Sequence, residues 1–133
     1  MSLLDTNIFI RYIVEDDLKK TDRCQKLFED VVSGKIELYV TDIAIAETIW
    51  VLESVYEFSH LKIRNLVEAI LVTQNLRFQN KEMLEEAIFL YEKYNIDFID
   101  GYHRAFMRQK GFSSIYSYDT DFDKIPEIER KEP

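Results

Sequence analysis

The sequence of 133 residues contains few of the residues that build disulfide-bonded, zinc-thiolate or membrane-spanning proteins. Cys24 is the only cysteine, which excludes a disulfide framework and a metal site made of several thiolates, and which fits a reducing compartment. No apolar run approaches the roughly 18 residues that a membrane helix requires. The N-terminus lacks a basic segment followed by an apolar core, so we expect no signal peptide and a cytoplasmic protein that does not bind membranes.

Glycine and proline are also scarce, with three and two copies, and the chain has no linker, internal repeat or low-complexity segment. Hydrophobic residues make up 47% of the chain, which is enough for a globular core and argues against disorder. The length predicts a single domain over residues 1–133. Within it, residues 126–133 form a charged C-terminal tail that is able to add an edge strand.

Positive charge is in short supply, because 17 lysine and arginine residues face 25 aspartate and glutamate residues. The resulting net charge of −8 argues against a protein that holds nucleic acid mainly through bulk positive charge. It permits a protein whose negative charge is concentrated where a cation binds, and it favours a basic partner.

Short apolar segments alternate with amphipathic segments along the whole chain. We predict strands over residues 2–5, 37–40, 75–79 and 115–118. We predict helices over residues 6–14, 18–33, 43–56, 60–72, 81–94 and 97–111. This alternation is typical of an α/β fold, with a central parallel sheet of about four to five strands and helices on both faces.

The predicted helix over residues 43–56 is unusually apolar, since its hydrophobic side chains cover more than one face. One interpretation is a helix buried on all sides. The other is that the spare face, which includes Trp50, meets a second copy of the chain in a homodimer. We expect the homodimer.

Carboxylates recur where predicted strands end and in the helices that follow: Asp5, Glu47, Asp97, Asp100, Asp119 and Asp121. Because the carboxyl ends of parallel strands point the same way, these groups are able to converge on one crevice. At the first strand an alternative stays open, in which Asp5 or Thr6 simply caps the following helix.

Converging carboxylates repel one another unless they take up protons or bind a metal ion. Carboxylate oxygens are the ligands that Mg²⁺ and Mn²⁺ prefer. Such a site can orient and deprotonate a water molecule and can stabilise charge on a phosphodiester.

Four segments in this order resemble PIN-domain nucleases, particularly the VapC-like toxins of toxin–antitoxin pairs: Leu4–Asn7, Ala46–Thr48, Asp97–Asp100 and Ser117–Phe122. The resemblance covers nearly the whole chain. It implies an endoribonuclease that depends on Mg²⁺ or Mn²⁺ and uses a catalytic quartet of Asp5, Glu47, Asp100 and Asp119. The metal ligands it implies are Asp5, Asp100, Asp119 and Asp121.

The resemblance also implies supporting residues around the acidic quartet. Thr6 and Ser117 would hydrogen-bond a metal-bound water or a phosphate oxygen, with Asn7 beside them. Asp97 either supports the site or only caps its helix. Gly101 is a departure, because such toxins often carry alanine there.

Two arginines are candidates for the rim that contacts phosphate or RNA. Arg11 lies two helical turns beyond Asp5. Arg104 lies four residues after Asp100 and either holds a phosphate or pairs with Asp97 or Asp100.

The implied partners are an RNA substrate and a small antitoxin whose basic segment would lay an amphipathic helix into a groove of the protein. A PIN-like module that binds a partner without catalysis is the main alternative. An aspartyl-phosphate phosphatase is less consistent with the sequence, because Asn7 stands where such enzymes usually carry a second acid. A signalling receiver domain is also disfavoured, since Asn80, and no lone aspartate, follows the third strand.

Overall fold

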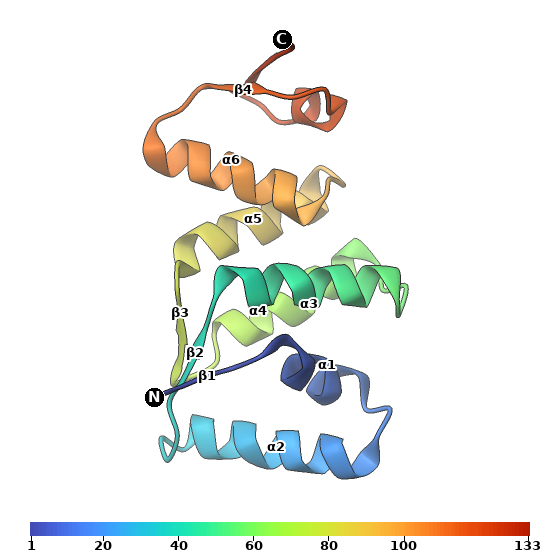
Figure 1. Ribbon diagram of the computed structural model, residues 1–133, viewed down its shortest axis with the longest axis vertical. Coiled ribbons are helices and arrows are strands. Elements are labelled where there is room, and N and C mark those ends of the chain that lie inside the picture. Colours follow the sequence, from blue (N-terminus) through green and yellow to red (C-terminus); the bar gives the residue numbers. More distant parts are fainter. The chain divides into compact units, whose positions relative to one another are not determined.

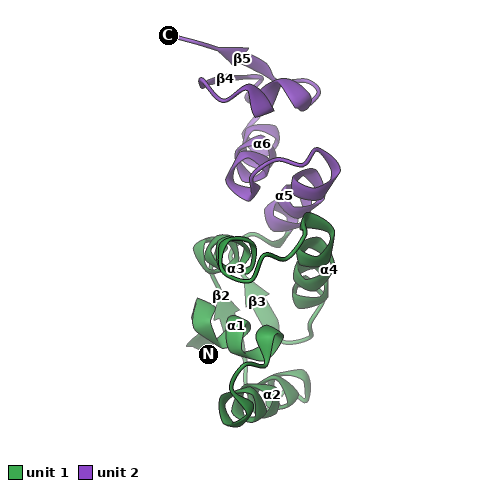
Figure 2. Cartoon of the chain, turned by 90° about the vertical axis from the view of Figure 1, so that its right-hand side faces the viewer, with its two compact units in different colours: residues 1–81 green, residues 82–133 purple.

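The computed structural model describes residues 1–133 throughout, and the chain divides into two compact units, residues 1–81 and residues 82–133 (Figure 2). The first unit contains β1 (Ser2–Leu3), α1 (Thr6–Val14), α2 (Leu18–Val32), β2 (Leu38–Val40), α3 (Asp42–Ser54), α4 (His60–Leu71) and β3 (Leu76–Phe78). At the boundary α5 (Lys81–Lys93) begins. The second unit continues with α6 (Phe98–Lys110), β4 (Ser114–Tyr116), the 3-10 helix η1 (Thr120–Lys124) and β5 (Glu129–Lys131).

The first unit is organised around a parallel sheet in the order β1-β2-β3. In the middle strand, Leu38 stands opposite Ser2 of β1 and Leu76 of β3. Parallel neighbours need long crossover connections, and here pairs of helices supply them, α1 with α2 and α3 with α4. The helix α1 packs against α2 and α3, and α3 packs against α4 (Figure 1).

Side chains at the helix starts explain where several helices of the first unit begin. The Asp17 carboxylate accepts a hydrogen bond from the backbone N–H of Lys20 at the start of α2. Thr41 caps α3 in the same way, and Ser59 caps α4. Each such bond satisfies a backbone donor that the helix itself leaves without an acceptor.

The core of the first unit is apolar and closely packed. Phe9 of α1 and Ile45 and Leu52 of α3 are fully buried. The Phe9 ring stacks on Phe28 of α2 with 5.9 Å between centroids. Burying one side chain of this size stabilises the folded state by roughly 1.5–3 kcal/mol. This burial holds α1 against α2 and α3 and so positions the residues at its N-terminal end.

The second unit has its own small core and its own sheet. Leu90, Ile96, Phe122 and Ile125 form a buried cluster. The strands β4 and β5 pair in parallel, with Ile115 opposite Arg130. The helices α5 and α6 approach closely at Gly101, where an added Cβ would lie 2.8 Å from the Ala87 carbonyl oxygen. The glycine therefore serves packing within the protein.

The predicted α/β class with parallel strands is confirmed, but the strands form two sheets, of three and two strands, and not one of four to five. The strands have only two or three residues, and β4 pairs with the tail strand β5. The helix α3 is buried on one face only, because Ile43 and Trp50 are 77% and 64% exposed. None of the helices has the length and apolar character needed to cross a membrane.

Candidate active site

Three carboxylates gather in the second unit. Asp100 lies in the first turn of α6, and Asp119 and Asp121 lie where the chain leaves β4 and enters η1. One carboxylate oxygen from each residue lies within 4.8 Å of the others. Asp100 is only 9% exposed, and its Oδ2 accepts no hydrogen bond. A buried acceptor of this kind costs about 1–3 kcal/mol unless it finds a partner.

Local hydrogen bonds hold this acidic cluster, defined here as Asp100, Asp119 and Asp121. The Ser117 hydroxyl oxygen accepts a bond from the backbone N–H of Asp119 at 2.9 Å. An Asp119 carboxylate oxygen in turn accepts from the backbone N–H of Asp121 at 2.9 Å. Asp121 also pairs with Lys124 at 2.9 Å. The cluster is therefore built into the turn between β4 and η1.

The electrostatics of the cluster disfavour a charged Asp100. The pKa of Asp100 is raised to about 7, most strongly by burial and also by a hydrogen bond to the Asp119 carboxyl and by the charges of Asp119, Asp97 and Asp121. Without a cation, Asp100 is therefore partly protonated at neutral pH. A positive charge placed between these carboxylates would remove the repulsion that keeps the proton there.

A second group of predicted residues lies in the first unit. The Thr6 hydroxyl is buried and donates a hydrogen bond to Glu47 Oε2 at 3.1 Å, with the Ala44 carbonyl 3.4 Å away. Asp5 is exposed beside Thr6. This contact joins the start of α1 to the second turn of α3.

Asp5 and Asp97 occupy N-cap positions, but their side chains do not cap the helices. Their backbones have the extended conformation of an N-cap, but neither side chain makes a capping hydrogen bond. The capping alternative therefore does not explain either carboxylate. Asp17, Thr41 and Ser59 differ in this respect, since their side chains do cap helices.

The two candidate rim arginines have partners that the sequence did not indicate. Arg11 pairs with Asp16 at 2.7 Å. Arg104 is buried and pairs with Glu127 at 3.3 Å, and not with Asp97 or Asp100. Nothing in the local spacing points to a partner 23 residues away. The role of Ser117 in holding Asp119 was visible in principle, because a serine two residues before an acid is the spacing of a side-chain turn.

The donor set of the acidic cluster consists of oxygen atoms alone. Hard divalent cations such as Mg²⁺ and Mn²⁺ take ligands of this type, and Mg²⁺ needs only a few protein carboxylates. The buried Asp100 Oδ2 without a hydrogen-bond donor is the kind of group that a cation would satisfy. The residues present therefore fit such an ion.

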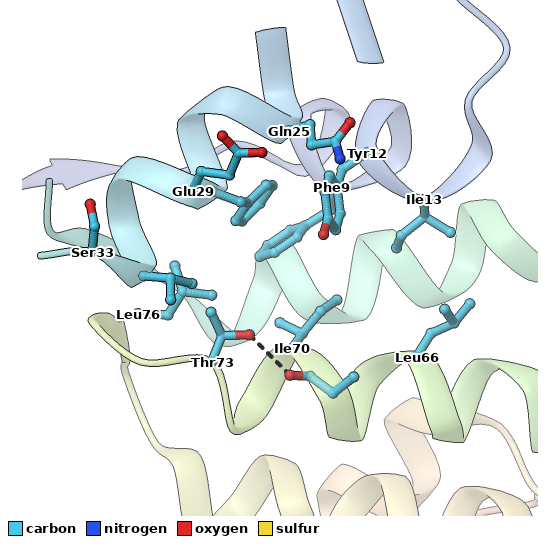
Figure 3. A pocket seen from close by; sticks show the side chains of 13 residues that line it. Phe9, Tyr12, Ile13, Gln25, Glu29, Ser33, Leu66, Ile70, Thr73 and Leu76 are labelled. Carbon is cyan, nitrogen blue, oxygen red and sulfur yellow. Dashed lines mark hydrogen bonds between the residues drawn. The ribbon is translucent and has the colours of Figure 1, made fainter. Parts of the chain in front are cut away.

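The first unit also carries an apolar groove between α1, α2 and α4, with a volume of about 510 Å³ (Figure 3). Its lining includes Phe9, Tyr12, Phe28, Leu66, Ile70 and Leu76. Polar side chains of α2, such as Gln25 and Glu29, stand along one side. Thr73 turns its hydroxyl to the Ala69 carbonyl at 3.0 Å, the dashed bond in Figure 3, and leaves this wall largely apolar.

Comparison with known proteins identifies the family. The family model of the PIN domain matches residues 2–128. The chain belongs to the PIN domain family. The matched range contains every candidate site carboxylate, and it covers most of both units of the chain.

Individual PIN proteins resemble the chain over most of its length. It is 26% identical over 125 residues to a protein named VapC ribonuclease from Aquifex aeolicus (strain VF5), which covers 94% of this chain and 92% of the relative. It is also similar to the crystal structure of Mycobacterium tuberculosis VapC20, titled a sarcin-ricin loop cleaving toxin. That similarity has a TM-score of 0.43 and 17% identity, and it covers 92% of this chain and 93% of the other.

Proposed function

We propose that this PIN domain is a metal-dependent endoribonuclease and the toxin of a toxin–antitoxin pair. The observation that carries the proposal is the acidic cluster, in which a buried carboxylate with a raised pKa lies beside two others. Carboxyl groups whose pKa is strongly shifted by burial and by neighbouring like charges cluster at functional sites. The relative named VapC ribonuclease supports the same activity.

We assign Asp5, Glu47, Asp100 and Asp119 as the catalytic quartet, and Asp5, Asp100, Asp119 and Asp121 as ligands of Mg²⁺ or Mn²⁺. Such an ion, when bound, supplies an acidified water and stabilises negative charge on a phosphodiester. Residues of the chain position the carboxylates. Ser117 fixes Asp119, and Thr6 orients the Glu47 carboxylate, which is then free to hold a water through its other oxygen.

The direct test is cleavage of a mixed RNA population by the purified full chain, with Mg²⁺, with Mn²⁺ and with a chelator. We expect cleavage with either metal and none with chelator. Asp100→Asn should abolish cleavage while keeping the shape of the side chain. Asp22→Asn is the matched control, because Asp22 is exposed on α2 and makes no ion pair. If the wild-type chain binds a partner but cleaves no RNA with either metal, its function is that of a non-catalytic PIN module.

We also propose the site at which the antitoxin binds. The lining of the apolar groove extends over about two helical turns of α2 and of α4, and it suits one face of an amphipathic helix. Glu29 at its edge and the net charge of −8 favour a basic helix. Co-expression with the neighbouring gene should recover a small basic protein bound to the chain. Recovery of the chain alone would contradict this assignment.

The remaining assignments concern the assembly of the chain. We propose that residues 1–133 act as one PIN domain, in agreement with the extent of the family match. We propose further that the chain forms a homodimer through the exposed face of α3, on which Ile43 and Trp50 lie seven residues and about two turns apart.

A further inference from the structure

Another hollow of the first unit lies between α1 and α2 and has a volume of about 340 Å³. Its lining comes from both helices: Asn7, Ile8 and Arg11 of α1, and Lys20, Arg23 and Cys24 of α2. We call this hollow the basic cleft, because three of its six lining residues are cations and none is acidic.

The cations of the basic cleft are only partly neutralised. Lys20 and Arg23 are exposed and make no ion pair. Arg11 pairs with Asp16 at 2.7 Å, but the side chains are 35% and 42% exposed. A pair so open to water contributes little to stability, so Arg11 can exchange this carboxylate for another anion.

The basic cleft adjoins the candidate site residues Asp5 and Thr6 at the start of α1. Asn7 directly follows Thr6, whose hydroxyl bonds to Glu47. Arg11 lies one helical turn beyond Asn7 and about 9 Å along the α1 axis from Asp5. An extended strand of nucleic acid that passes Asp5 would therefore bring its neighbouring phosphates to the cleft.

We propose that the basic cleft binds the phosphodiester backbone of RNA next to the segment that is held for cleavage. The inference rests on the proposed ribonuclease function and names a substrate site for it. Arginine and lysine are the usual partners of phosphate oxygens, and the Asn7 amide adds a further donor. Cations spread over two helices match a repeating phosphate chain better than a single anion. The cleft thus offsets the repulsion between RNA and an acidic protein.

The test measures binding of a short, labelled, single-stranded RNA of mixed sequence to the full chain, in chelator, over a range of salt concentrations. The variant is Lys20→Gln/Arg23→Gln. The matched control, Lys19→Gln/Lys26→Gln, removes the same charge from exposed positions on the same helix that do not line the cleft. The conservative variant Lys20→Arg/Arg23→Lys keeps both charges.

We expect the Lys20→Gln/Arg23→Gln variant to bind RNA about tenfold more weakly than the control. The slope of log affinity against log salt is negative, and its magnitude should decrease by ~0.7 for each phosphate contact that is lost. In cleavage assays KM should rise while kcat stays within about twofold, because Lys20 and Arg23 lie on α2 and are not among the proposed catalytic residues. The conservative variant should restore both the affinity and the salt slope, which a merely structural role of these residues would not predict.

Equal affinity and equal salt slope for the cleft variant and its control would overturn the proposal, even if the wild type cleaves RNA. Binding of a poly-aspartate peptide as tightly as RNA would also overturn it, since the cleft would then recognise acidic protein. If no metal supports cleavage by the wild type, the ribonuclease assignment fails. A selective loss of RNA binding in the cleft variant would still support the cleft as an RNA site.

Discussion

A carboxylate oxygen of Asp100 lies within 4.8 Å of one of Asp119, although Asp100 is buried and its Oδ2 accepts no hydrogen bond. Burial and this neighbour raise the pKa of Asp100 to about 7. Two acids held so close make the metal-free protein less stable than it would be with one of them neutral. The contact therefore links the candidate site to the stability of the fold.

Asp100→Asn should abolish RNA cleavage and leave the metal-free protein as stable as the wild type or more stable, on the order of 1 kcal/mol, since one pKa unit corresponds to about that energy. The amide removes the repelling charge and keeps the shape. Thermal melting in chelator measures the change. Asp17→Ala is the contrasting case, because it removes a helix cap and should destabilise by roughly 0.5–2 kcal/mol. If Asp100→Asn instead melts well below the wild type, Asp100 is structural.

The metal-free stability should depend on pH in the direction set by Asp100. Its pKa is 3.8 in the unfolded chain and about 7 in the folded one, so the native state holds more protons between these values. The free energy of unfolding should therefore fall as pH rises from about 4 to about 7. Urea unfolding in chelator across this range measures it. The Asp100→Asn variant should lose this part of the pH dependence, and an identical profile in the variant would contradict the assignment.

Addition of Mg²⁺ should raise the melting temperature of the wild type by mass action, because only the folded chain presents the site. Protons and the ion compete for the same carboxylates, so the gain should be larger at pH 8 than at pH 5. Asp22→Asn should respond like the wild type. A response of equal size in Asp100→Asn would place the ion elsewhere on the protein.

Thr6→Val should lower kcat by about tenfold with little change in melting temperature. The substitution keeps the buried shape but removes the hydroxyl that donates to Glu47 Oε2 at 3.1 Å. Glu47 is exposed, so the bond orients the carboxylate more than it stabilises the fold. Steady-state cleavage and thermal melting separate the two effects. Unchanged kcat would show that Glu47 does not need this orientation.

Gly101→Ala should destabilise the protein by about 1–3 kcal/mol, although alanine is the better helix former by ~1 kcal/mol. The new methyl group would lie 2.8 Å from the Ala87 carbonyl oxygen, so α5 and α6 would have to separate. Urea unfolding measures the change. Stabilisation by the alanine would mean that the two helices do not approach as closely as described.

The sequence alone determined the local structure. The helix α1 begins at Thr6 and ends at Val14 as predicted, because a strand-terminating aspartate precedes an apolar pattern with helical period. The start of α4 at His60 followed from the serine before it, whose side chain does cap the helix. The order of acids after strands was enough to indicate the PIN family. The helix starts depend on residues close together in the chain, where spacing and chemistry decide the outcome.

Only the tertiary structure decided how distant groups meet. Asp5, Asp97 and Asp17 all stand before helices in the sequence, yet only Asp17 caps one, since a cap depends on the direction of the side chain. The pairing of Arg104 with Glu127 and the raised pKa of Asp100 arise from contacts across the second unit. The division of the strands into two sheets likewise followed from pairing between β4 and β5, because hydrogen bonds between strands depend on the path of the chain and not on local composition.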